Sequence, residues 1–251
     1  MNKINLNVIN VNNISQIEVL NKINKTLLKS DNPKVLVTPN AGHLSQIYKD
    51  SSLQNIYKSA DLCLIDGWPI AVAANIASKQ KVSRVTGSDL LPELLKNLNK
   101  EIRVGIIGGT DQNVIRQKLE NLYPNLNLQL IDTSDWSDSI YDIRRLRELV
   151  QFNALSIVLL CLGHPKQEIL ANELKNYDWV GARPDWILCL GASVDYITGQ
   201  QKRSPKIFTK IGLEWVYRLF SDPKKFSRRY LNAIWPSIKL ISNSFQMRKF
   251  N

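Results

Sequence analysis

Short runs of β-branched and apolar residues alternate along this chain with longer stretches of helical periodicity. The candidate strands are residues 34–37, 62–65, 103–107, 126–131, 156–162 and 186–190. Within these runs apolar residues do not alternate strictly with polar ones, so we expect strands that are buried on both faces. Such strands, separated by helices, predict an α/β fold of Rossmann-like type, with a mostly parallel sheet flanked by helices.

The alternation of predicted strands and helices ends after Gly191, and only helical patterns and basic residues follow. We therefore predict an α/β domain over residues 1–195 and a basic, amphipathic helical appendage over residues 196–251. The opening stretch 4–11 alternates like a half-exposed strand or hairpin. The chain shows no apolar run near the ~20 residues of a membrane span, and no apolar stretch typical of a signal peptide. Its cysteines lie inside apolar runs, which is typical of reduced thiols in a cytosolic protein.

The predicted appendage carries nearly all of the net charge. Residues 201–251 hold twelve Lys or Arg against two acidic residues, a net charge of +10 out of +11 for the whole chain. Aromatic and aliphatic residues are interleaved with these cations. This mixture suits an anionic membrane surface, because cations meet the headgroups while aromatic side chains enter the interface. It also suits single-stranded nucleic acid, since aromatic rings stack on bases, and a nucleic-acid-binding α/β protein is therefore the alternative function.

Polar or glycine-containing segments follow five of the predicted strands. These segments are residues 38–43, 66–69, 108–111, 163–168 and 191–195, and a further polar loop, 84–89, joins two helical stretches. In open α/β sheets, ligands bind beyond the carboxyl ends of the strands. The predicted fold would gather these segments along one edge of the sheet, which predicts a small-molecule site there.

Several of these segments also have a purely structural interpretation. The Gly-Gly-Thr-Asp sequence at 108–111 is either a turn with a helix N-cap or a phosphate cradle, because helix N-termini offer free N–H groups. Asp66 either caps the next helix or acts as a base at the ligand edge. We interpret His164 as an ordinary loop histidine. The absence of a Walker sequence and of a complete Gly-x-Gly-x-x-Gly disfavours a nucleoside triphosphatase or a dinucleotide oxidoreductase. Only two histidines and no suitable cysteine spacing predict that no metal is bound.

Taken in order, the motifs of this chain resemble the WecG/TagA/CpsF glycosyltransferases, glycosyltransferase family 26, from about residue 33 to residue 235. The motifs are Thr38-Pro39-Asn40, Asp66-Gly67, Arg84-Val85-Thr86-Gly87-Ser88-Asp89, Gly163-His164-Pro165-Lys166-Gln167-Glu168, Gly191-Ala192-Ser193-Val194-Asp195-Tyr196, Lys202-Arg203-Ser204-Pro205 and Gly212-Leu213-Glu214-Trp215-Val216-Tyr217-Arg218-Leu219. One motif alone is weak evidence, but all of them in this order on the predicted fold form a strong signal. Pro39, His43 and Asp66-Gly67-Trp68-Pro69 resemble exopolysaccharide members more than teichoic-acid members.

The resemblance implies a metal-independent, inverting hexosyltransferase of bacterial surface polysaccharide synthesis. The donor would be a UDP-sugar of the N-acetylmannosamine, N-acetylmannosaminuronic acid, glucose or galactose type, and no cofactor is implied. The acceptor would be a polyprenyl-diphosphate-linked saccharide, extended through a β-linkage at the inner face of the cytoplasmic membrane. Relatives also suggest self-association. The chain lacks an Asp-x-Asp metal motif, because Asp132-Thr133-Ser134-Asp135 has the wrong spacing.

The resemblance also implies roles for individual residues. Asp66 would be the general base, and Thr38, Asn40 and Gln167 would surround the reacting sugars. The residues expected to bind the donor are Arg84, Gly108, Gly109, Thr110, Trp136, Gly163 and Asp195. The residues expected to bind the acceptor or diphosphate are His43, Arg203, Arg218, Arg228 and Arg229. Without a metal, either Arg84, the 108–110 loop or the arginines of the appendage must stabilise the leaving diphosphate, and the sequence leaves that choice open.

Overall fold

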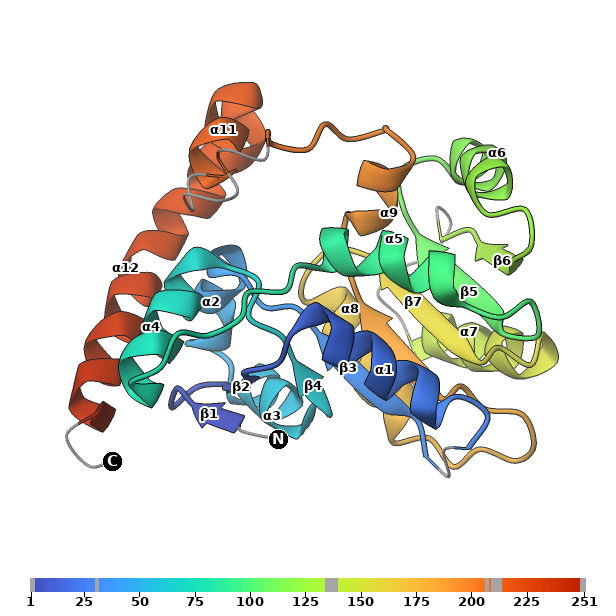
Figure 1. Cartoon of the computed structure of the whole chain (residues 1–251), viewed down its shortest axis with the longest axis horizontal. Coiled ribbons are helices and arrows are strands. Elements are labelled where there is room, and N and C mark those ends of the chain that lie inside the picture. Colours follow the sequence, from blue (N-terminus) through green and yellow to red (C-terminus); the bar gives the residue numbers. More distant parts are fainter. Residues whose placement is uncertain (1–2, 30–31, 134–139, 206–207, 209–213, 249–251) are drawn as a thin grey trace.

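The structure of the chain is a computed structural model, and it describes residues 3–29, 32–133, 140–205, 208 and 214–248 (Figure 1). Its strands are β1 (Lys3–Asn5), β2 (Asn10–Asn12), β3 (Lys34–Val37), β4 (Leu62–Cys63), β5 (Arg103–Gly108), β6 (Asn127–Ile131), β7 (Ile157–Cys161) and β8 (Trp186–Cys189). Its helices are α1 (Gln16–Thr26), α2 (Ala41–Ile47), α3 (Ser51–Ser59), α4 (Trp68–Ser78), α5 (Gly87–Asn97), α6 (Gln112–Leu122), α7 (Ile140–Phe152), α8 (Lys166–Lys175), α9 (Ser193–Ile197), α11 (Glu214–Ser221) and α12 (Pro223–Arg248).

Six strands form one parallel sheet in the order β4-β3-β8-β7-β5-β6, which confirms the predicted Rossmann-like α/β class. All six predicted strands are present. β4 is shorter than predicted, because beyond Cys63 only Leu64 still pairs, through a 2.9 Å hydrogen bond to the Val37 carbonyl oxygen and a single bridge with Asn12. Of the strand or hairpin predicted for residues 4–11, the structure forms the hairpin, with β1 and β2 paired antiparallel.

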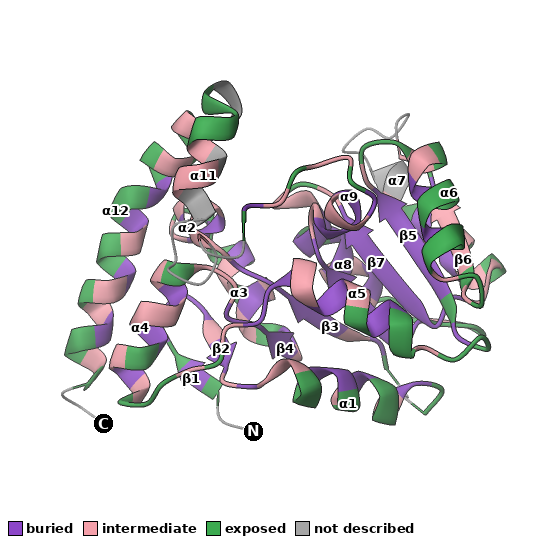
Figure 2. Cartoon of the chain, turned by 45° about the horizontal axis from the view of Figure 1, so that its top comes forward, coloured by how far each residue is buried: buried purple, intermediate pink, exposed green. Residues whose placement is uncertain are grey.

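Side chains of the central strands alternate between two hydrophobic cores, one on each face of the sheet. In β7, Val158 and Leu160 enter one core while Ile157 and Leu159 enter the other. The first core is completed by α2, α3, α4, α7, α8 and α12, and the second by α1, α5, α6 and α9. Figure 2 shows the buried strands between these helices. Burial on both faces is therefore the reason that the strand sequences lack an apolar–polar alternation.

The C-terminal helix α12 packs along α4 and α2, at one end of the molecule (Figure 1). Ala233, Leu240 and Ser244 on one face of α12 are buried. The opposite face carries exposed apolar side chains, namely Leu231, Ile234, Trp235, Ile238 and Phe245. Among the described residues, none of the helices combines the length and apolar character needed to cross a membrane.

Candidate active site

The loops that follow β3 and β4 meet at Asn40. The Asn40 carboxamide caps α2, since its Oδ1 accepts a hydrogen bond of 3.0 Å from the Gly42 N–H. The N–H of Gly67 faces the carbonyl oxygen of Pro39 at 3.4 Å. A Cβ added to Gly67 would lie only 2.9 Å from the Cα of Asn40, so only glycine permits this approach. The half-buried Asp66 is therefore held next to Asn40, at the carboxyl ends of two neighbouring parallel strands.

The polar loop 84–89 is brought to the same place by a backbone contact. The Val85 N–H donates a 2.9 Å hydrogen bond to the carbonyl oxygen of Ile65, which places this loop against the segment that carries Asp66. Further along this loop, the Asp89 carboxylate forms a 2.7 Å ion pair with Arg203. The structure thus brings the loop that carries Arg84 to the segment of the candidate base, while Arg203 ties the segment before α11 to the start of α5.

Arg229, in the first half of α12, reaches the same site from the appendage. Its Nη2 donates a 3.2 Å hydrogen bond to Oδ1 of Asn40, and its guanidinium lies against Gly42. Arg228 and Arg229 are both exposed, and the bond to Asn40 is what links Arg229 to this site. Arg218 belongs to α11, but its side chain lies outside the described residues, as does the whole of Trp136. Of the described arginines of the appendage, Arg229 is therefore the one that the structure joins to Asn40.

Thr38 and Gln167 hold the ends of the central strands together. The Thr38 hydroxyl donates a 3.0 Å hydrogen bond to the Cys189 carbonyl oxygen. Gln167 accepts from the Gly191 N–H at 3.0 Å and donates to Glu168 at 2.9 Å. Both side chains are buried. Their hydrogen bonds define a positioning role, and the direct contacts with sugars that the resemblance implies remain predictions.

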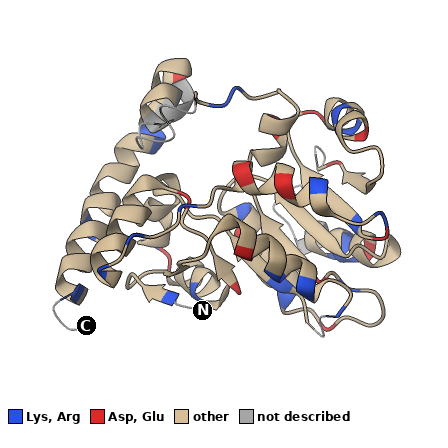
Figure 3. Cartoon of the chain, in the orientation of Figure 1, with Lys and Arg blue, Asp and Glu red and all other residues tan. Residues whose placement is uncertain are grey.

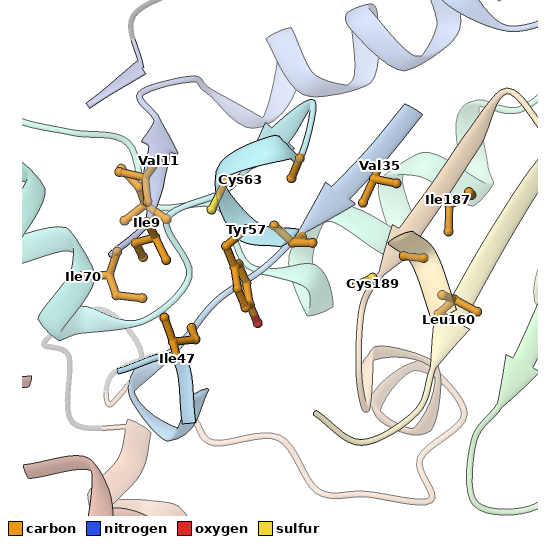
Figure 4. Close-up of a cluster of buried hydrophobic side chains, with 14 of the residues drawn as sticks. Ile9, Val11, Val35, Ile47, Tyr57, Cys63, Ile70, Leu160, Ile187 and Cys189 are labelled. Carbon is orange, nitrogen blue, oxygen red and sulfur yellow. The ribbon is translucent and has the colours of Figure 1, made fainter. Parts of the chain in front are cut away.

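A buried polar network centred on Glu168 lies beneath α2. The Glu168 carboxylate accepts hydrogen bonds from the Tyr57 hydroxyl at 3.0 Å and from His164 Nδ1 at 3.1 Å. The Tyr57 hydroxyl also lies 3.1 Å from His43 Nδ1. The Tyr57 ring itself belongs to the hydrophobic cluster that includes Ile47 (Figure 4). His164 lies in the turn before α8, as a loop histidine would, but its side chain is only 7% exposed and belongs to this buried polar network.

Burial and the contacts within the network together determine the charge states of His43 and Glu168. Burial lowers the pKa of His43 to about 3, so that its imidazole is neutral near neutral pH. Burial alone would raise the pKa of Glu168. The hydrogen bond from His164, the attraction of the His43 and His164 charges and the hydrogen bond from Gln167 outweigh it, and they lower the pKa to about 2. His43 was expected to bind acceptor or diphosphate. That role stays a prediction, although a buried neutral ring bonded to Tyr57 suits packing better than anion binding.

His43, His164 and Glu168 also bring three metal-binding side chains together. Their ligand atoms lie within 4.8 Å of one another. However, the two imidazole rings are stacked, with centroids 4.1 Å apart and planes inclined by only 6°. A nitrogen lone pair lies in the plane of its ring, so two parallel rings cannot both direct lone pairs at one ion unless a ring rotates. The geometry therefore disfavours a metal centre at this cluster, and the absence of a metal elsewhere stays a prediction.

The glycine loop after β5 is occupied by carboxylates of the protein. The Thr110 N–H donates a 2.8 Å hydrogen bond to Oδ1 of Asp195, and Asp111 caps the first N–H groups of α6. Gly108 and Gly109 both have positive φ values, of 90° and 93°. Carboxylates already accept from the N–H groups of Thr110 and of the first turn of α6. The loop therefore suits a turn with an N-cap better than a phosphate cradle. Gly163, by contrast, is exposed, and a Cβ added to it would meet no atom within 4 Å.

Fold and site together define a class of protein: an α/β enzyme with a carboxylate, an amide and arginines gathered beyond the carboxyl ends of parallel strands. A model of the Glycosyl transferase WecG/TagA/CpsF family matches residues 4–249. The chain belongs to this family, and it is therefore a glycosyltransferase of cell-surface polysaccharide synthesis. The match includes the appendage as well as the sheet, and it favours this function over the nucleic-acid alternative.

Three residues of the site were not singled out by sequence reasoning. Tyr57 lies in a helical stretch with no local polar signal, and Glu168 was noted only as part of a motif. Gly42 was not distinguished from its neighbours. A search for charged or hydroxyl-bearing residues in otherwise apolar helical faces would have found Tyr57. The importance of Gly42 depends on a contact with a residue 187 positions away and has no local signal.

Proposed function

We propose that the enzyme is an inverting transferase that moves a sugar from a UDP-sugar to a polyprenyl-diphosphate-linked saccharide and forms a β-linkage. The observation that supports this most directly is at Asn40, which bonds Arg229 and packs against Gly67, the residue that follows Asp66. A carboxylate beside an amide and a guanidinium supplies a base, a hydrogen-bonding group for sugar hydroxyls and a cation for phosphate oxygens.

In the proposed reaction, Asp66 takes the proton of the acceptor hydroxyl while that oxygen attacks the anomeric carbon of the donor. The bond from this carbon to the diphosphate oxygen breaks at the same time, so the configuration inverts and UDP leaves. Charge grows on the departing diphosphate, and cations placed there in advance stabilise it. The residue after Arg84 bonds to the residue before Asp66, and Arg229 bonds to Asn40, so we assign this role to these two arginines.

The remaining donor contacts follow from the positions of the strand ends. Gly163, at the open end of β7, leaves room for a ligand, and the nearly buried Asp195 would accept hydrogen bonds from the uridine. The donor sugar would be of the N-acetylmannosamine, N-acetylmannosaminuronic acid, glucose or galactose type. We propose that no metal takes part, and the parallel rings of His43 and His164 support this for the cluster that they form.

A donor screen tests the proposed reaction. The full chain would be incubated with a panel of UDP-sugars and a short lipid-diphosphate-GlcNAc acceptor, each with and without EDTA. We expect UDP release and a β-linked product with one class of UDP-sugar, at an unchanged rate in EDTA. Loss of transfer in EDTA that returns on adding Mg²⁺ or Mn²⁺ would contradict the metal-free mechanism. An α-linked product would contradict inversion, and absence of product with every donor would contradict the proposed substrates.

We also propose that the appendage places the enzyme on the inner face of the cytoplasmic membrane. The exposed apolar face of α12 is accompanied by cations on α12 and on the segment before α11 (Figure 3). Each cation near an acidic bilayer contributes about 1 kcal/mol to binding, and exposed Trp and Ile side chains enter the interface.

Replacing Trp235 and Ile238 with glutamate should weaken binding to anionic vesicles by about tenfold or more, because it removes apolar insertion and adds charge repulsion. Vesicle sedimentation measures this. The double variant Gln117→Glu/Asn121→Glu, at two exposed positions of α6, adds two charges away from α12; it is the matched control and should bind nearly as the wild type does. The membrane role would be contradicted if the Trp235/Ile238 variant bound vesicles as the wild type does. It would also be contradicted if the wild type bound single-stranded DNA more tightly than anionic vesicles, in a salt-sensitive way.

A further inference from the structure

Gly42, in the first turn of α2, lies directly beneath the guanidinium of Arg229. A Cβ added at this position would lie 2.8 Å from Nη2 and 2.9 Å from Cζ of Arg229, and it would overlap Nε as well. These separations are shorter than van der Waals contact. A larger residue at position 42 therefore leaves no room for the guanidinium at the place where it bonds Asn40.

The backbone at Gly42 does not require glycine. Gly42 lies within α2 and is not among the residues with positive φ, so an alanine could adopt the same conformation. Glycine is also the least favourable residue in a helix interior apart from proline, and alanine is the most favourable. Space for Arg229, rather than backbone conformation, is thus what this glycine provides.

We propose that Gly42 is a positioning residue, which by lacking a side chain lets Arg229 of α12 lie across α2 and reach the candidate active site. The inference rests on the proposed function, in which Arg229 meets the leaving diphosphate. Asn40 orients the guanidinium through its Oδ1, and Asn40 in turn packs against the loop that carries Asp66. The next residue, His43, is buried and neutral, so it does not repel the guanidinium.

The same geometry makes Gly42→Ala a selective variant. The added methyl group would overlap the far end of a long, flexible side chain, and rotation of Arg229 away from α2 relieves the overlap. Helix α2 itself gains from alanine. The variant should therefore keep its fold and lose only the position of Arg229.

Transfer rates of Gly42→Ala, Arg229→Ala and the double variant test the proposal. Loss of a hydrogen-bonded charge should lower kcat by about 10- to 100-fold in each single variant. Because both changes remove the same contact, the double variant should be no slower than Arg229→Ala. Gln46→Ala, on the exposed side of α2, is the matched control and should keep wild-type activity. A wild-type rate in Gly42→Ala, or a further loss on adding it to Arg229→Ala, would overturn the proposal.

A measurement that needs no activity separates this proposal from the proposed function. The side-chain Nε–H resonance of Arg229, assigned by its absence in Arg229→Ala, should shift in Gly42→Ala at an unchanged melting temperature. A shift in a protein that transfers no sugar would support the role of Gly42 and contradict the proposed reaction. An unchanged resonance in an active enzyme would contradict the role of Gly42 and leave the reaction supported.

Discussion

Replacing Asp66 with asparagine is expected to lower the rate of sugar transfer by about 10²–10⁴-fold, the usual contribution of a general base. The substitution keeps the size of the side chain and removes the basic carboxylate. The loop should keep its shape, because its position depends on the contact of Gly67 with Asn40. Initial rates of UDP release with acceptor present measure the effect, and the melting temperature shows whether the fold is intact.

Asp61 offers a matched control at the opposite end of the same strand. Its carboxylate accepts a 2.9 Å hydrogen bond from the Val35 N–H and pairs with Lys175 at 2.7 Å, so its role is structural. Asp61→Asn should lose some stability and keep the transfer rate. If Asp66→Asn were as active as the wild type, Asp66 would not be the base, and another group would have to take the acceptor proton.

Replacing Glu168 with alanine is expected to lower the free energy of unfolding by about 3–5 kcal/mol, as is usual when a buried charged partner is removed. The change removes the carboxylate that accepts hydrogen bonds from the Tyr57 hydroxyl, His164 Nδ1 and the Gln167 amide. The Tyr57 hydroxyl keeps His43 Nδ1 and His164 Nδ1 as neighbours. Urea unfolding measures this. Glu173→Ala on the same helix is the control, because its 3.2 Å pair with Arg147 is partly exposed and such pairs contribute only about 0–1 kcal/mol.

The stability of the wild type should also depend on pH through Glu168. Its pKa is about 2 in the folded protein against the ordinary value of 4.5, so the unfolded chain binds more protons between these values. The stabilisation is therefore present above pH 4.5 and is lost as the pH falls toward 2. Glu168→Ala should show a flatter dependence over this range. If the stability of Glu168→Ala depended on pH as steeply as that of the wild type, the role assigned to this carboxylate would be contradicted. The same would follow if Glu168→Ala lost no more stability than Glu173→Ala.

The sheet could be predicted because its signal is local. An apolar run such as 156–162 sends alternate side chains into two cores, and a strand buried on both faces carries that property in its own residues. The end of β4 was less predictable. Leu64 and Ile65 are as apolar as the residues before them, yet the register with β3 ends at Cys63, followed by one hydrogen bond from Leu64 to Val37. Where pairing ends depends on the partner strand.

Some residues of the candidate site could likewise be predicted from the sequence, and others could not. Asp66 and Asn40 could be found from the sequence, because each follows a strand and parallel strands bring their carboxyl ends to one edge. The sequence could not show which arginine of the appendage reaches the site. Similar basic and aromatic residues flank all of them, namely Arg203, Arg218, Arg228 and Arg229. The packing of α12 on α2 and α4 places Arg229 on Asn40, while Arg203 pairs with Asp89.

The sequence by itself determined the α/β class, the edge of the sheet where the site lies and the family resemblance, because periodicity and motifs are properties of neighbouring residues. Only the tertiary structure decided that His43, Tyr57, His164 and Glu168 share one buried network, and that Gly42 makes room for Arg229. These contacts join segments far apart in the chain. They arise from the packing of helices on the sheet, and no pattern within a single segment encodes them.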